Sequence, residues 1–162
     1  KLTPLLHGGG QQNGIRSGTL PVPLCVGMAS ACELLINDET QASRKHTASL
    51  TKYFYEKLKN MDVKLQLNGP PLLERHVGNL NISFKNIDAS ELLMMLQPKV
   101  CASTGSACSS GKIETSHVLE SIGLSSERKK GAVRFSFSHQ MTFEQLDYGL
   151  DIIKNTVSHL TG

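Results

Sequence analysis

Tryptophan is absent from this 162-residue chain, and aromatic side chains make up only 5% of it. Proteins that stack nucleic-acid bases need aromatic platforms, which this composition hardly supplies. The net charge of +3 is also too small to indicate a phosphate-binding surface. The one basic cluster, Arg128–Lys130, is interpreted as a solvated loop. We therefore expect no nucleic acid among the partners of this protein.

Long apolar runs are missing as well. No stretch approaches the roughly 18–20 residues that a membrane-spanning helix needs, and no secretory signal opens the chain. At 39% hydrophobic and 19% charged residues, the composition is that of a globular protein. We expect no membrane association and a cytoplasmic location, or the mitochondrial matrix if the source is eukaryotic.

Cysteine is scarce, with four residues at positions 25, 32, 101 and 108. A chain of this size does not need disulfides for a stable core, so a reducing compartment is expected. Cys25 and Cys32, like Cys101 and Cys108, are seven positions apart, whereas compact zinc sites use closer spacings. We expect no metal site, and we interpret Cys25, Cys32 and Cys101 as small buried hydrophobic residues.

Hydrophobic periodicity predicts an α+β fold with a small antiparallel or mixed sheet covered by helices on one side. Residues 22–36 are apolar nearly all round, which predicts a buried helix. Thr142 and Gln145 form a capping-box pattern before a long terminal helix. We expect residues 1–21 to be a loop on the cofactor side and 22–162 to be one small domain. The remaining elements are predicted as a helix at 50–58, strands at 63–67 and 80–84, a short helix at 92–96 with Asp88 as its N-cap, a strand at 99–103, a helix at 116–122 and a strand at 133–137.

Glycine is concentrated in two segments. The first, His7-Gly-Gly-Gly-Gln-Gln-Asn-Gly-Ile-Arg-Ser-Gly-Thr19, exposes backbone N–H groups and ends in a hydroxyl, which suits phosphate binding or a plain connection. In the second, Cys101-Ala-Ser-Thr-Gly-Ser-Ala-Cys-Ser-Ser-Gly111, only small residues flank Cys108. An uncrowded thiol between two glycines suits a nucleophile that must reach its substrate, although a buried structural cysteine would also fit.

A strand pattern at Val133-Arg-Phe-Ser-Phe137 sends Val133, Phe135 and Phe137 to the core. Arg134 then faces the other side of the sheet. A guanidinium on a rigid strand suits bidentate capture of a carboxylate, although a surface arginine is the simpler interpretation.

These three segments, in this order, resemble the class V aminotransferase-like family and, within it, cysteine desulfurases of the NifS/IscS type. Arg16-Ser-Gly-Thr19 looks like the end of that family's loop after the cofactor lysine, and Ser103-Thr-Gly-Ser-Ala-Cys108 looks like its active-site cysteine loop. Arg134-Phe-Ser136 looks like its carboxylate-binding strand. The similarity extends over almost the whole chain and implies the C-terminal domain of a fold-type I enzyme that depends on pyridoxal 5'-phosphate (PLP).

The resemblance implies a role for each of three residues. Cys108 would take the sulfur of L-cysteine as a persulfide and leave alanine, and Arg134 would hold the substrate carboxylate. Thr19 would contact the PLP phosphate of a partner subunit, because members of this family are homodimers. The sulfur would pass to an acceptor such as an iron–sulfur scaffold protein.

The family's Schiff-base lysine lies upstream of the segment that Lys1 onward matches. We therefore expect this chain alone to be incomplete and inactive. Two alternatives stay open at this point: a selenocysteine lyase, and a non-enzymatic thiol or persulfide carrier that uses Cys108 without PLP.

Overall fold

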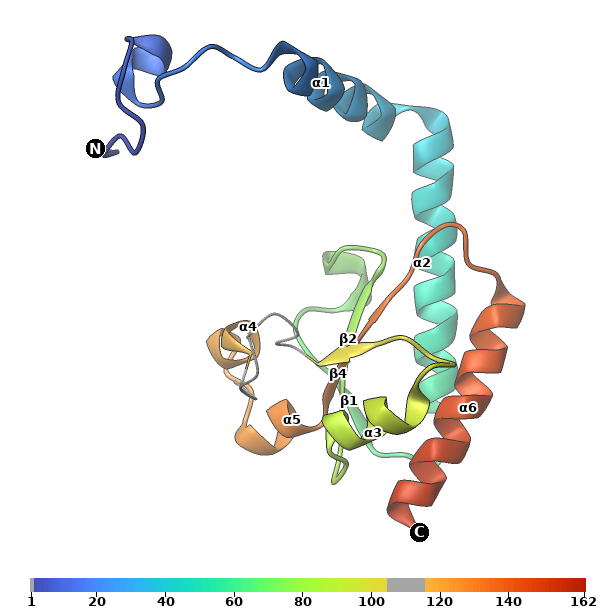
Figure 1. Ribbon diagram of the computed structural model, residues 1–162. Coiled ribbons are helices and arrows are strands. Elements are labelled where there is room, and N and C mark those ends of the chain that lie inside the picture. The colour runs from blue at the N-terminus through green and yellow to red at the C-terminus, as the bar shows by residue number, and fades with distance from the viewer. Residues whose placement is uncertain (1, 105–115) are drawn as a thin grey trace. The chain divides into compact units, whose positions relative to one another are not determined.

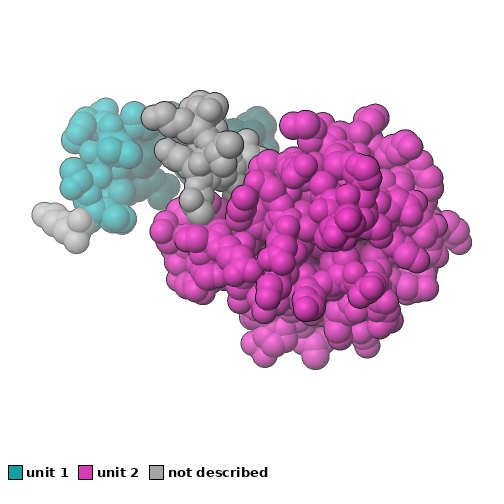
Figure 2. All heavy atoms as spheres, turned by 90° about the horizontal axis from the view of Figure 1, so that it is seen from below, with its two compact units in different colours: residues 1–41 teal, residues 42–162 magenta. Residues whose placement is uncertain are grey.

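The computed structural model describes residues 2–104 and 116–162 (Figure 1). The chain divides into two compact units, residues 1–41 and 42–162, which Figure 2 colours separately. Helix α2 (Asp38–Lys59) contains the boundary between them. The domain boundary expected after residue 21 stays a proposal.

Unit 1 contains a 3₁₀ turn, η1 (Gln11–Gly14), and helix α1 (Val22–Ile36), whose bounds are those expected from the sequence. The predicted burial of this helix is wrong, because all of its residues, Cys25 and Cys32 included, are exposed. The physical reason is that the described residues of unit 1, 2–41, form no second helix layer or sheet that could cover α1. An apolar sequence predicts a buried helix only where something packs against it.

Unit 2 is built around a four-stranded sheet with the order β1-β2-β4-β3, and every neighbouring pair is antiparallel. The predicted α+β class is therefore confirmed. After α2 come β1 (Leu65–Leu67), the 3₁₀ turn η2 (Leu72–Glu74), β2 (Asn79–Phe84), α3 (Ala89–Leu96), β3 (Ser103–Thr104), α4 (His117–Ser121), α5 (Ser126–Lys130), β4 (Ala132–Ser136) and α6 (Phe143–Thr161).

One face of the sheet carries the hydrophobic core. Figure 1 shows α2 and α6 side by side, and the apolar stripes of α2, α3 and α6 meet the alternating apolar residues of β2 and β4. Helix α6 begins at the predicted capping box, in which Thr142 Oγ1 accepts from Gln145 N and Gln145 Oε1 accepts from Thr142 N. The core residues are Leu50, Phe54, Leu58, Leu80, Ile82, Phe84, Ile87, Ala89, Leu92, Leu96, Val133, Phe135, Leu146, Leu150, Ile153 and Val157.

Two helical segments differ from the sequence-based expectation. Helix α2 begins at Asp38, well before the apolar stripe, because Asn37 Oδ1 accepts from Thr40 N at 2.7 Å and caps it. The Arg128–Lys130 cluster lies in the short helix α5, not in a solvated loop. Gly131 follows this helix, and a side chain there would collide with the Phe84 carbonyl of β2. Helix α5 is therefore held close against the sheet.

The core gives a direct stability prediction. Leu80 of β2 is 0% exposed, whereas Leu73 in the β1–β2 connection is 99% exposed. Leu80→Ala removes buried apolar atoms and leaves a cavity, so we expect a loss of about 2–5 kcal/mol in the free energy of unfolding. The same substitution at Leu73 is expected to change it by less than about 0.5 kcal/mol. Urea unfolding followed by circular dichroism compares the two, and equal losses would contradict the assigned core.

Candidate functional site

The sheet has a polar face opposite the core. Because side chains alternate along a strand, the residues of β2 and β4 that lie between the core positions share this second face. In β2 these are Asn79, Asn81 and Ser83, and in β4 they are Arg134 and Ser136. The observed strand thus orients Arg134 away from the core, as the alternation in the sequence predicts.

Strand register brings three of these residues into one row. Asn81 of β2 pairs with Arg134 of β4, and Arg134 pairs on its other side with Ser103 of β3. Directly opposite residues in neighbouring antiparallel strands have Cβ atoms about 4.5–5.5 Å apart. Arg134 is therefore flanked by an amide on one side and by the start of the cysteine-containing segment on the other.

A cavity of about 250 Å³ opens over this row. Arg134 and Asn81 line it, and so does Ser116, which caps α4 by accepting from Leu119 N. The remaining lining residues are Asn68, Gly69, Pro70, Arg75, Asn79, Val118, Leu119 and Ile122. No acidic side chain belongs to this described lining, which carries two guanidinium groups, so the cavity suits an anionic ligand.

The two arginines of the cavity differ in how they are held. Arg75 donates from Nε to the Pro70 carbonyl at 2.8 Å and from Nη2 to the Asn68 carbonyl at 2.8 Å. Burial lowers the pKa of Arg75, since removal from water disfavours the cation. The Arg134 side chain is exposed, and its guanidinium makes no hydrogen bond or ion pair within residues 2–104 and 116–162. Of the two cavity arginines, Arg134 is therefore the one whose guanidinium is not held by a described residue.

Cys108 lies outside the described residues, and the structure places only the two ends of its segment. On one side β3 ends at Thr104, paired with Val133, one residue from Arg134. On the other side Ser116 lines the same cavity as Arg134. One end of the cysteine segment thus lines the cavity through Ser116, and the other end pairs with the strand that carries Arg134.

The predicted phosphate contact, Thr19, lies in unit 1 and follows a loop closed by its own hydrogen bonds. Ser17 Oγ donates to the Gly9 carbonyl at 2.6 Å, and Gly18 N donates to Gln11 Oε1 at 3.2 Å. Gln12 and Asn13 adopt left-handed backbone conformations with φ of 53° and 56°. The Thr19 side chain is exposed beyond this loop. It is therefore accessible to a ligand.

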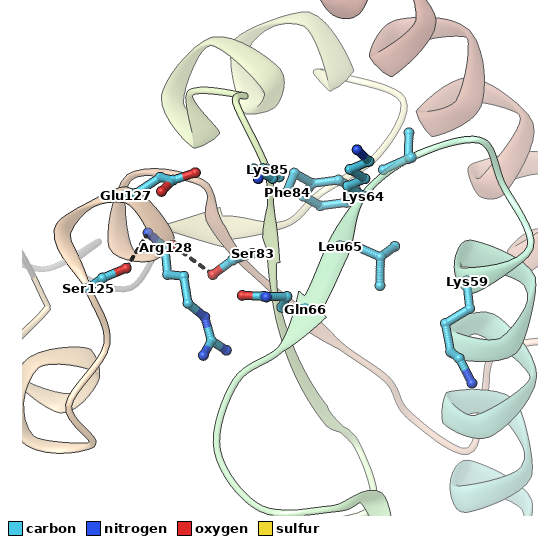
Figure 3. Close-up of a pocket in the computed structure, with 11 residues that line it drawn as sticks. Lys59, Lys64, Leu65, Gln66, Ser83, Phe84, Lys85, Ser125, Glu127 and Arg128 are labelled. Atoms are coloured by element: carbon cyan, nitrogen blue, oxygen red, sulfur yellow. Dashed lines mark hydrogen bonds between the residues drawn. The ribbon is translucent and has the colours of Figure 1, made fainter.

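Two larger pockets of unit 2 lack a predicted site residue. One, of about 610 Å³, is bordered by Lys59, Lys64, Lys85 and Arg128 beside the edge strand β1 (Figure 3). The other, of about 770 Å³, is lined by Cys101 together with apolar residues of β4 and α6. Cys101 is exposed, so its interpretation as a buried residue is wrong: the residue lies between α3 and β3, where no helix or strand of the described residues covers it.

Asn81 and Arg75 are cavity residues that sequence reasoning did not single out. For Asn81 a signal was available, because the alternation of Leu80, Ile82 and Phe84 places Asn81 on the same face as Arg134. Arg75 had no such signal, because it follows a 3₁₀ turn in an irregular connection.

In the described part of the chain, no three His, Cys, Asp or Glu residues gather as metal ligands. None of the described helices is both long and apolar enough to span a membrane.

Comparison with known proteins decides the family. The sequence profile of the family "Aminotransferase class-V" matches residues 5–148. The chain belongs to the class V aminotransferase family. A curated relative, the "Probable cysteine desulfurase, mitochondrial" of Dictyostelium discoideum, is 36% identical to this chain. The match covers 99% of this chain and 35% of the relative. "Cysteine desulfurase IscS" of Rickettsia africae (strain ESF-5) is also 36% identical, over 99% of this chain and 38% of the relative.

Solved structures agree with this assignment. A "NIFS-LIKE PROTEIN" superposes with a TM-score of 0.72 at 33% identity, over 96% of this class V aminotransferase chain and 39% of the other chain. The NifS-like protein from Rickettsia africae ESF-5 gives a TM-score of 0.75 at 25% identity, over 98% and 41%. The chain thus spans 35–41% of the length of these relatives. The predicted resemblance to NifS/IscS-type proteins is confirmed, and the roles of individual residues stay predictions.

Proposed function

We propose that this chain is the part of a PLP-dependent cysteine desulfurase that holds the substrate carboxylate and carries the acceptor thiol. The observation that supports this proposal best is the position of Arg134. Its guanidinium has no partner among the described residues and lines a cavity without acidic lining residues. Ser116, after the segment that contains Cys108, lines the same cavity, and Ser103, before it, pairs with Arg134. An amino-acid carboxylate and a reactive thiol would therefore be brought together.

Chain geometry supports this arrangement. Cys108 is four residues beyond Thr104, the end of β3, and an extended chain spans at most about 3.6 Å per residue. The Cα atom of Cys108 can therefore be at most about 14–15 Å from that of Thr104, whose strand partner Val133 is adjacent to Arg134. A connection of this length is compatible with a thiol that meets a substrate held by Arg134.

The proposed reaction involves two bonds. The thiolate of Cys108 attacks the sulfur of L-cysteine, so an S–S bond forms while the substrate C–S bond breaks. The electron pair of the broken bond remains on the substrate carbon, which takes a proton to give alanine, and Cys108 is left as a persulfide. PLP, when bound, supplies the electron sink that this carbon chemistry requires. Arg134 orients the substrate throughout by binding its carboxylate.

The residues present fit part of a PLP site. Thr19 offers an exposed hydroxyl after a glycine-rich loop, which suits one contact to a phosphate, in our proposal that of a partner subunit in a homodimer. The resemblance implies that the family's cofactor lysine lies upstream of the segment that Lys1 onward matches. We infer that the chain by itself does not turn over L-cysteine. In the complete protein the persulfide is delivered to a sulfur acceptor or iron–sulfur scaffold protein, in the cytoplasm or the mitochondrial matrix.

The experiment that tests the function measures alanine. The PLP-loaded protein that contains this chain is incubated with L-cysteine and a thiol reductant, and alanine and sulfide are quantified together. We expect equal amounts of the two products, and none from L-serine, which has no sulfur to transfer. Release of pyruvate, or turnover confined to L-selenocysteine, would overturn the proposal and in the second case favour a selenocysteine lyase.

A further inference from the structure

A chain of partly buried hydrogen bonds leads from α5 to Asn81, which lines the Arg134 cavity. Arg128 Nη2 donates to Asn68 Oδ1 at 2.6 Å and to the Leu67 carbonyl at 3.0 Å. Asn68 Nδ2 donates in turn to Asn81 Oδ1 at 2.7 Å and to Ser83 Oγ at 2.8 Å. Asn68 and Ser83 are each only 3% exposed. The last residue of this chain of bonds, Asn81, pairs directly with Arg134.

The short helix α5 is fixed to the sheet at the same point. Ser83 Oγ donates to the Arg128 carbonyl at 2.7 Å, and Arg128 N donates to Ser125 Oγ at 3.3 Å, as the dashed lines in Figure 3 show. The backbone of Arg128 is thus held on β2 while its guanidinium reaches Asn68. The position of this guanidinium is therefore determined by contacts at both ends of the residue.

Arg128 determines which way both amides point. A guanidinium only donates hydrogen bonds, so the Asn68 atom that it meets must be the carbonyl oxygen. The other end of Asn68 is then its NH₂ group, and the Asn81 atom that meets this group must also be an oxygen. The NH₂ group of Asn81 is left as a donor, on a half-buried residue that lines the cavity beside Arg134.

We propose that Asn81 is a second donor to the substrate carboxylate beside Arg134, and that Asn68 and Arg128 are positioning residues that fix its orientation. The inference rests on the proposed function, because it takes the carboxylate of L-cysteine as the ligand of this cavity. A carboxylate has two oxygens and accepts several hydrogen bonds, so an amide and a guanidinium on adjacent strands bind it together.

The test compares variants of the PLP-loaded protein that contains this chain. For each, the KM and kcat for L-cysteine and the Kd of the product L-alanine are measured, with cysteamine, which lacks a carboxylate, as the control ligand. Asn81→Ala is expected to raise the KM and the Kd about 10-fold and to leave cysteamine binding within about 2-fold, because one hydrogen bond to a charged group is lost. Ser136→Ala, on the same face of the sheet but outside the cavity lining and the hydrogen-bond chain, is expected to change neither by more than about 2-fold.

Asn68→Asp tests the positioning role separately. The new carboxylate still accepts from Arg128, but it cannot donate to Asn81. Asn81 therefore turns its NH₂ group toward position 68 and its oxygen toward the substrate carboxylate. We expect a loss of L-alanine affinity at least as large as that of Asn81→Ala, with cysteamine binding unchanged. In the double variant Asn68→Asp/Asn81→Ala, the loss should equal that of Asn81→Ala alone, because Asn68 acts only through Asn81.

The outcomes distinguish a failure of the carboxylate site at Arg134 from a failure of the role proposed for Asn81. If Arg134→Ala leaves the Kd of L-alanine unchanged, the carboxylate site itself is wrong. If Arg134→Ala weakens binding while Asn81→Ala stays within about 2-fold of wild type, only this inference is overturned, and the network serves to hold α5 on the sheet. Should Asn81→Ala not fold, the isosteric Asn81→Asp replaces it. Its oxygen still accepts from Asn68, and its charge is expected to abolish L-alanine binding.

Discussion

Replacing Cys108 with serine is expected to lower alanine formation from L-cysteine by about 10³-fold or more, because serine cannot accept sulfur as a persulfide. Cys101→Ser is the matched control. It changes the same atom in the same stretch of sequence, but Cys101 lines a different pocket, between α6 and β4. We expect Cys101→Ser to retain more than half of the activity.

Both variants are assayed for alanine with saturating L-cysteine under the same conditions. An absorption spectrum of the bound cofactor is recorded for each variant. It checks that a loss of activity does not come from a loss of PLP. Equal loss in the two variants would point to a general disturbance of this segment. Full activity in Cys108→Ser would rule out Cys108 as the acceptor thiol.

Replacing Arg134 with alanine is expected to lower kcat/KM for L-cysteine about 100-fold, which corresponds to about 2.7 kcal/mol. The loss should appear mainly in KM, since the guanidinium binds the carboxylate before and during the reaction. Arg134→Lys keeps the charge but not the two-pronged geometry, and we expect an intermediate loss of about 10-fold. Val133 and Phe135 on either side are core residues, so the substitution at the exposed position 134 should leave the fold intact.

The measurement is steady-state kinetics with L-cysteine, together with the Kd of cysteamine as the carboxylate-free reference. An Arg134→Ala protein that loses affinity for both ligands equally would show that Arg134 does not recognise the carboxylate. A selective loss for L-cysteine would support the proposed orientation of the substrate in the cavity of about 250 Å³.

Helices and strands with a clear hydrophobic periodicity were predictable from the sequence. The apolar stripe of α6, together with Thr142 and Gln145, predicts both where that helix begins and which face it buries. The alternation in β2 and β4 predicts the core face and, with it, the orientation of Arg134. In these segments local pattern and tertiary packing favour the same structure.

Elements that depend on tertiary contacts were not predictable in the same way. Helix α5 is five residues long with no apolar stripe, so its presence follows from the Ser125 cap and from Arg128 reaching Asn68. Strand β3 has two residues, too few for any alternation, and it begins where its pairing with Arg134 begins. The role proposed for Asn81 depends on the register between β2 and β4, which a single sequence does not give.

The distribution of sulfur after a single turnover tests the account most directly. The PLP-loaded protein is mixed with one equivalent of L-cysteine without reductant, free thiols and persulfides are alkylated, and the protein is digested with trypsin. Cleavage after Lys99 and Lys112 releases a peptide that carries both Cys101 and Cys108, so one fragmentation spectrum compares the two thiols. The account predicts one added sulfur on Cys108, none on Cys101, and one alanine per persulfide. Alanine without sulfur on Cys108, or sulfur on Cys101 instead, would contradict it.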